Sequence, residues 1–161
     1  MSGLERSTTP RLRAGAIAAI ATLVLDQASK LWLLYVFDLA NRGAVRVTPF
    51  FDLVLAWNVG ISFGWFQTDN QFAQVVLTVW MARSRNLLAT LALGLIIGGA
   101  IGNAIDRFAY GAVVDFALFH IDIGGKTFNW YVFNLADVAI VAGVAGLLYD
   151  SFLGVPAAKA P

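Results

Sequence analysis

LLATLALGLIIGGAIGNAID, residues 87–106, is the stretch of sequence that predicts the fold class. From Leu87 to about Ile105 it carries no charged side chain, which is typical of a helix that spans a membrane. Gly94, Gly98 and Gly102 are spaced four residues apart, so they would lie along one face of that helix. Small residues at this spacing let membrane helices approach one another closely. We therefore expect a membrane-spanning helix with a close neighbour.

The composition of the whole chain supports a membrane protein. Of its 161 residues 59% are hydrophobic and only 13% are charged, and the mean hydropathy is +0.73. Soluble domains carry roughly 25% charged residues. So few charges cannot cover the surface of a soluble domain of this size, which predicts an integral membrane protein. The net charge of +1 argues against nucleic acid as a partner.

Three further segments extend the prediction to four transmembrane helices, at about 14–37, 69–86, 87–105 and 132–153. The first follows a basic stretch, which also fits a cleaved signal peptide, but no convincing cleavage site precedes Asp26. The second is short, because its apolar run covers only residues 72–81. It could cross a membrane only by starting near Asp69 and letting its terminal arginines snorkel. The expected fold class is an all-α membrane protein.

Two loops, 38–68 and 106–131, would lie on the opposite side from the termini. Lys and Arg number six in the termini and the 82–86 turn and four in these loops, which favours cytoplasmic termini. Residues 45–57 are rich in strand formers, and residues 116–132 resemble a hairpin around Gly124-Gly125. We expect a small extracytoplasmic sheet, a single membrane-embedded domain over 1–154 and a disordered tail over 155–161.

Polar side chains occur where a membrane should exclude them. Three spaced pairs stand in or beside the predicted spans: Asp26 with Lys30, Asn103 with Asp106, and Asn134 with Asp137. Ionisable groups inside a membrane are costly and usually functional. Structural roles stay open for several of them. The first pair could be an ion pair that fixes helix packing, Asp106-Arg107 could anchor a helix end, and both asparagines could bond to backbone.

Asp115 and Asp137 are harder to explain as structural residues, because each follows an apolar stretch and lacks a nearby Lys or Arg. Two carboxylates in a low-dielectric site share a proton, so the pair supplies a base and an acid at once. Such a pair can activate water and stabilise the oxyanion of a peptide carbonyl. This chemistry requires no metal and no cofactor, and we expect neither. The chain has no Cys, and its single His120 is expected to be a sheet residue rather than a base.

The polar residues described above belong to five short motifs, which occur in this order along the chain: DQASK at 26–30, NVGISF at 58–63, GGAIGNAIDR at 98–107, GAVVDF at 111–116 and FNLAD at 133–137. Together they resemble the lipoprotein signal peptidase family, the bacterial type II signal peptidases. The resemblance implies a four-helix aspartyl protease of the inner membrane with both termini in the cytoplasm. It would cleave the signal peptide from diacylglyceryl-modified prolipoproteins, just before the lipid-bearing Cys.

The resemblance also implies roles for particular residues. The catalytic aspartates fall on Asp115 and Asp137 near the outer leaflet, and residues 44–57 would form a membrane-resting β-cradle. Substrate binding and support of the catalytic pair fall on Asp26, Lys30, Asn58, Gly60, Asn103, Asp106, Arg107 and Asn134. The implied partners are the lipid-modified prolipoprotein, membrane lipids and globomycin-type inhibitors. The stretch between the second span and Gly98 is shorter than is usual in the family.

Two other classes of function are alternatives to a signal peptidase. A small proton- or ion-coupled transporter would also use intramembrane aspartates, but broken central helices and internal repeats would be expected, and the Asp pair here stands at one end of the spans. A structural subunit could pack through its glycine faces alone.

Overall fold

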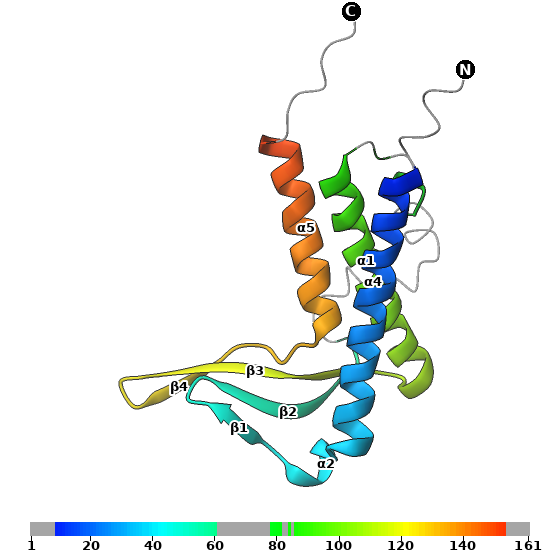
Figure 1. The fold of residues 1–161 in the computed structure, drawn as a ribbon. Helices are drawn as coiled ribbons and strands as arrows, with labels where there is room; N and C mark the ends of the chain where they lie inside the picture. Colours follow the sequence, from blue (N-terminus) through cyan, green and yellow to red (C-terminus); the bar gives the residue numbers. More distant parts are fainter. Residues whose placement is uncertain (1–8, 61–77, 82–83, 85, 154–161) are drawn as a thin grey trace, which may run out of the picture.

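Three long helices form the body of the part of the chain that the structure describes. The computed structural model describes residues 9–60, 78–81, 84 and 86–153. The long helices are α1 (Thr9–Leu31), which continues as the π-helical turn η2 (Trp32–Val36), α4 (Leu87–Tyr110) and α5 (Leu135–Leu153) (Figure 1). Within the described residues, these three are long and apolar enough to cross a membrane. They overlap the spans expected at 14–37, 87–105 and 132–153. Most of the span expected at 69–86 lies outside the described residues.

The ends of two helices differ from the sequence prediction. Helix α4 continues to Tyr110 rather than ending near 105, so Asn103 and Asp106 lie inside the helix and not at its end. Gly111, at φ 74°, ends it and donates its N–H to the carbonyl of Arg107. Helix α5 begins at Leu135 rather than 132, because Phe133 forms a β-bridge with Ala117. The segment expected between these two helices, at 106–131, therefore begins and ends several residues later in the chain.

Close packing places α4 between α1 and α5. A Cβ atom added at Gly94 would collide with the carbonyl oxygen of Gly15, and one added at Gly98 would collide with that of Ala19. On the other side, Gly143 of α5 lies against the carbonyl of Ala92. The glycine face expected on residues 94–102 is confirmed. The close approach that it allows also brings together the polar side chains of the three helices.

This packing predicts the effect of a single methyl group. Gly98→Ala is expected to lower the free energy of unfolding by about 1–3 kcal/mol, because the methyl meets rigid backbone on α1. Gly146→Ala is the matched comparison, since its methyl would meet only side chains, the nearest at 3.2 Å. Thermal unfolding in detergent measures both variants. Equal stability of the two would contradict the packing argument.

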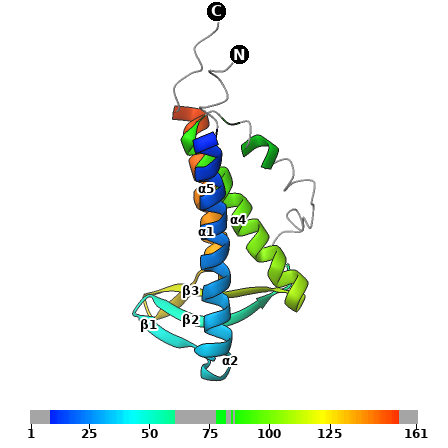
Figure 2. The same cartoon turned by 45° about the vertical axis from the view of Figure 1, so that its right-hand side comes forward.

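A four-stranded antiparallel sheet lies across one end of the helices. Its order is β1 (Val45–Thr48), β2 (Phe51–Asn58), β3 (Val113–Ile123) and β4 (Lys126–Asn129), and the short helix α2 (Leu39–Arg42) precedes it. The expected hairpin is confirmed, with Gly124 and Gly125 at φ 60° and 77° in the turn. The start of α1 and the end of α5 lie at the end away from the sheet (Figures 1 and 2).

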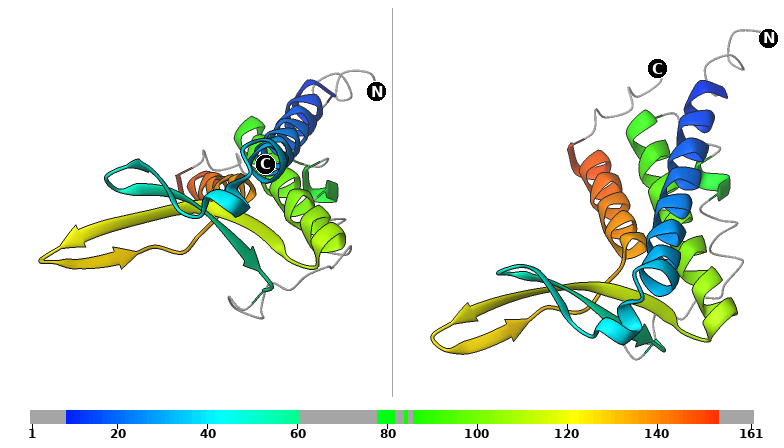
Figure 3. Two further views of the ribbon diagram at one scale, coloured as in Figure 1. Left: turned by 90° about the horizontal axis from the view of Figure 1, so that it is seen from below. Right: turned by 60° about the horizontal axis from the view of Figure 1, so that its bottom comes forward.

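The sheet reaches well beyond the helices on one side. Seen from below, the β3–β4 hairpin projects past α5 (Figure 3). Its inner part is anchored by a core cluster in which Leu33 and Leu39 pack with Phe116 and Ala117. The first half of β3 is therefore buried, while its far half is mostly exposed apart from His120. The buried half holds Asp115 at the junction between the sheet and the helices.

Candidate active site

Asp115 and Asp137 are brought together by one asparagine. Asn134 Nδ2 donates to Asp115 Oδ1 at 2.7 Å, and the Asn134 backbone N–H donates to Asp137 Oδ2 at 3.2 Å. The Asp137 N–H donates in return to Asn134 Oδ1 at 3.0 Å. This reciprocal pair is a capping box at the start of α5. The N-x-x-D spacing therefore both begins the helix and aligns the two carboxyl groups, called the dyad below.

Asp115 is held from the other side by strand β2. The register pairs Ala56 with Asp115 and Asn58 with Val113. Asn58 Nδ2 donates to Asp115 Oδ2 at 3.0 Å, while Asn58 Oδ1 accepts the N–H of Gly60 at 2.9 Å. Gly60 has φ 87°, a conformation that favours glycine. The predicted site residues Asn58 and Gly60 thus act together to fix the Asn58 side chain.

Asn103 connects the dyad with the charged residues of α1. Its Nδ2 donates to Asp137 Oδ1 at 2.9 Å. Its Oδ1 accepts from Asn134 Nδ2 at 3.0 Å and from Lys30 Nζ at 3.2 Å. Every polar atom of this buried amide side chain is therefore used, as a low-dielectric site requires.

The predicted ion pair of Asp26 and Lys30 is confirmed, and a third residue joins it. Lys30 Nζ lies 2.8 Å from Asp26 Oδ2 and 2.7 Å from Asp106 Oδ2, and all three side chains are buried. Asp26 Oδ1 accepts the N–H of Ala136 at 3.0 Å, and Asp106 Oδ2 accepts the N–H of Val114 at 3.0 Å. Each of these amides belongs to the residue that precedes a dyad aspartate. The charged cluster is therefore joined to the backbone on both sides of the site.

The environment of Asp115 favours its protonated form. Burial first, and then the negative charge of Asp137, raise the pKa of Asp115 from 3.8 to about 6. The hydrogen bonds from Asn58 and Asn134 and the charge of Lys30 act in the opposite direction. A carboxyl group with a raised pKa beside a second carboxylate can hold the proton that the pair shares.

This raised pKa predicts a pH dependence of stability. Between about pH 4 and pH 6 the folded protein holds a proton at Asp115 that the unfolded chain releases. The contribution of Asp115 to the free energy of unfolding therefore falls as the pH rises through this window. Asp115→Asn is neutral at every pH, so its stability relative to the wild type is expected to rise from about pH 4 to pH 6. Unfolding in detergent at a series of pH values measures this difference, and a constant difference would contradict it.

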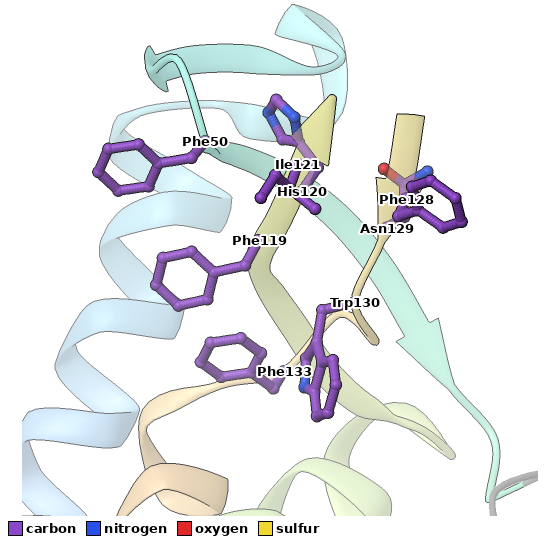
Figure 4. Close-up of a pocket in the computed structure, with 8 residues that line it drawn as sticks. All are labelled: Phe50, Phe119, His120, Ile121, Phe128, Asn129, Trp130 and Phe133. Atoms are coloured by element: carbon purple, nitrogen blue, oxygen red, sulfur yellow. The ribbon is translucent and has the colours of Figure 1, made fainter. Parts of the chain in front are cut away.

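Two apolar grooves lie next to each other and share Trp130 and Phe133, and one of them reaches Asp137. One, of about 540 Å³, is lined by Asp137 and by Val138, Val141, Ala142 and Ala145 of α5 together with Trp130 and Phe133. The second, of about 500 Å³, shares Trp130 and Phe133 and continues along the outer part of the sheet. Figure 4 shows the rings of Phe50, Phe119 and Phe133 in a row along it. An apolar ligand in the first groove would lie against Asp137.

The remaining sequence candidates have local roles. Arg107 donates to the carbonyl of Asn103 at 3.5 Å on its own helix. His120 is buried in β3, with Nε2 3.3 Å from Asp52 Oδ1, as expected for a sheet residue. In the part of the chain that the structure describes, no group of three or more His, Cys, Asp or Glu side chains could hold a metal ion.

Gln27 is the residue of this region that sequence reasoning did not select. Its Nε2 lies 2.9 Å from Asp106 Oδ1 and 3.1 Å from the carbonyl oxygen of Gly102. Its presence within the DQASK motif was the available signal.

Proteins that are similar to this chain belong to one family. Residues 18–153 match the family model for signal peptidase (SPase) II. Proteins named lipoprotein signal peptidase are similar at 71% identity in Nitrobacter hamburgensis and 65% in Rhodopseudomonas palustris, each over 93% of this chain and 98% of the relative. A bacterial membrane enzyme solved by the in meso method at 1.9 Å shares the fold, with a TM-score of 0.69 and 24% identity over 88% of this chain and 94% of that one. The chain belongs to the signal peptidase II family.

Proposed function

We propose that this protein is an aspartyl endopeptidase that removes the signal peptide from diacylglyceryl-modified prolipoproteins, cutting before the lipid-bearing Cys. Membership of the signal peptidase II family supports the substrate class, and it does not support an ion-coupled transporter. The observation that carries the aspartyl mechanism is the position of Asn134, which bonds to both Asp115 and Asp137. Both carboxyl groups therefore bond to the same residue, which supports their acting as a pair.

The environments of the two carboxyl groups support a division of roles. Asp115 is buried, and burial and the charge of Asp137 raise its pKa, which favours Asp115 as the carrier of the shared proton that donates a hydrogen bond to the scissile carbonyl oxygen. Asp137 is half-buried and lines the groove, so its carboxylate takes a proton from the attacking water. The water oxygen bonds to the carbonyl carbon, and the oxyanion is stabilised by the proton on Asp115. The C–N bond then breaks as the leaving amine of the Cys receives a proton from the dyad.

The location of the dyad within the fold supports a site near the outer leaflet of the membrane. Asp115 lies on β3 and Asp137 in the first turn of α5. Figure 1 shows that the sheet and the start of α5 lie at the end opposite the start of α1 and the end of α5. With both termini in the cytoplasm of a bacterial inner membrane, the dyad lies near the outer leaflet. Both grooves are apolar and the first is lined by Asp137, which suits the signal peptide, membrane lipids and a globomycin-type inhibitor.

Cleavage by the purified protein tests the function. A lipidated prolipoprotein in liposomes is expected to release its signal peptide, with mass spectrometry locating the cut before the Cys. The same precursor without the diacylglyceryl group is the control and is expected to be cleaved far more slowly. Equal cleavage of both precursors would contradict the substrate class, and no cleavage of either would contradict the function.

A further inference from the structure

Gln27 is a polar residue of α1 that the proposed mechanism leaves unused. A primary amide has two N–H donors. The Nε2 of Gln27 has two well-placed acceptors, Asp106 Oδ1 at 2.9 Å and the Gly102 carbonyl at 3.1 Å, both on α4. Asp26 Oδ2 lies farther away, at 3.3 Å. The amide therefore ties one carboxylate oxygen of Asp106 to the α1–α4 interface.

The other oxygen of Asp106 faces the dyad strand. Asp106 Oδ2 accepts the Val114 N–H at 3.0 Å and lies 2.7 Å from Lys30 Nζ. The side-chain torsion that rotates an aspartate carboxylate has no sharp preferred value. A hydrogen bond to one carboxylate oxygen therefore restricts where the other oxygen can lie. With Oδ1 held by Gln27, Oδ2 is directed at the Val114 amide.

The Val114 amide lies one residue before Asp115. Val114 is fully buried and pairs with Trp57 in the β2–β3 register, while Asp115 pairs with Ala56. Successive side chains of a strand point to opposite faces. The position of the Val114 amide therefore sets the direction in which Asp115 leaves the strand toward Asn134.

We infer that Gln27 is a positioning residue for the dyad, acting on Asp115 through the carboxylate of Asp106 and the amide of Val114. The inference rests on the proposed function and deepens it. Gln27 does not line either groove beside the dyad. It is therefore expected to affect the chemical step rather than substrate binding.

Gln27→Met keeps the length of the side chain but removes both N–H donors. The Asp106 carboxylate can then rotate, and Asp115 shifts relative to the scissile bond. Misplacement by about 1 Å can slow a reaction ~10²-fold. We expect kcat to fall roughly 10-fold or more, with KM unchanged. A change in KM at constant kcat would overturn the inference.

The pH dependence of the activity of Gln27→Glu distinguishes a positioning role from a purely structural one. The charged groups around position 27 are Asp26 and Lys30 of α1 and Asp106 of α4. A protonated Glu can donate to Asp106 as the amide does, whereas an ionised Glu repels it. The activity of Gln27→Glu relative to the wild type is expected to fall as the pH rises. Met at position 27 cannot ionise, so the relative activity of Gln27→Met is expected to vary only across the titration of Asp115 itself. The same pH profile in both variants would overturn the inference.

Ser29→Ala is the matched control on the same turn of α1. Ser29 Oγ donates to the Asp26 carbonyl at 2.7 Å, so the variant loses a hydrogen bond within the helix and leaves Asp106 untouched. It is expected to retain wild-type kcat. Thermal unfolding of all variants is measured in parallel. A fall in kcat that only follows the unfolded fraction would overturn the inference.

A spectroscopic titration tests the inference without catalysis. The side-chain carboxyl carbon of Asp115 is followed by ¹³C NMR as a function of pH in the wild type, Gln27→Met and Ser29→Ala. Its titration midpoint is expected to move in Gln27→Met and not in Ser29→Ala, because only the former frees the Asp106 carboxylate. An unmoved midpoint in Gln27→Met would overturn the inference whether or not the wild type cleaves prolipoprotein. A wild type that is inactive while the midpoint moves would contradict the proposed function alone.

Discussion

Replacing Asp115 or Asp137 with Asn is expected to slow prolipoprotein cleavage by roughly 10³-fold or more, because each change removes one of the two proton-transfer groups. The amides have nearly the same shape as the carboxyl groups. Asn at 137 can still accept the Asn134 N–H, so the start of α5 is expected to persist. Single-turnover cleavage of lipidated prolipoprotein, with thermal unfolding measured in parallel, separates lost chemistry from lost structure.

Asp122→Asn is the control for these variants. Asp122 lies on the same strand as Asp115, but it is exposed and accepts from Thr127 far from the dyad. It is expected to cleave at the wild-type rate. The double variant Asp115→Asn/Asp137→Asn should be hardly slower than either single one, because residues that act as a unit are not additive. Folded single variants with substantial activity would refute the dyad.

Lys30→Met is expected to be the most destabilising of the substitutions considered. It leaves Asp26 and Asp106 buried without the ammonium group that lies within 2.8 Å of both. Breaking a buried ion pair by removing one partner lowers the free energy of unfolding by about 3–5 kcal/mol. Both carboxylates also hold backbone amides beside the dyad, so activity is expected to fall with stability. Unfolding midpoints in detergent measure the loss.

Neutralising the two carboxylates tests the cause of that loss. The triple variant Asp26→Asn/Lys30→Met/Asp106→Asn is expected to be more stable than Lys30→Met, because it leaves no unpaired buried charge. Lys126→Met on β4 is the matched control at an exposed position and is expected to keep wild-type stability. A Lys30→Met protein as stable as the wild type would contradict the electrostatic explanation.

Local patterns in the chain predicted much of the fold. The strands β1 and β2, the hairpin turn at Gly124-Gly125 and the pairing of Asp26 with Lys30 follow from residues within a few positions of each other. Helix ends were predicted less well. The apolar pattern of α4 stops near Ile105, but the helix continues because Gly111 is the residue that provides its C-cap. At α5 the pairing of Phe133 with β3, a long-range contact, delays the start of the helix.

The sequence by itself determined that this is a membrane protein of the signal peptidase II family. Its low charge, its glycine spacing and the order of its motifs are properties of the chain, and each has a local physical meaning. Only the tertiary structure decided how the site is assembled. Lys30 bridges Asp26 with Asp106, Asp26 accepts the amide of Ala136, and Gln27 holds Asp106. Apart from the i,i+4 pair of Asp26 and Lys30, these contacts join residues that are far apart in the chain, and helix packing rather than local spacing selects which buried donor meets which acceptor.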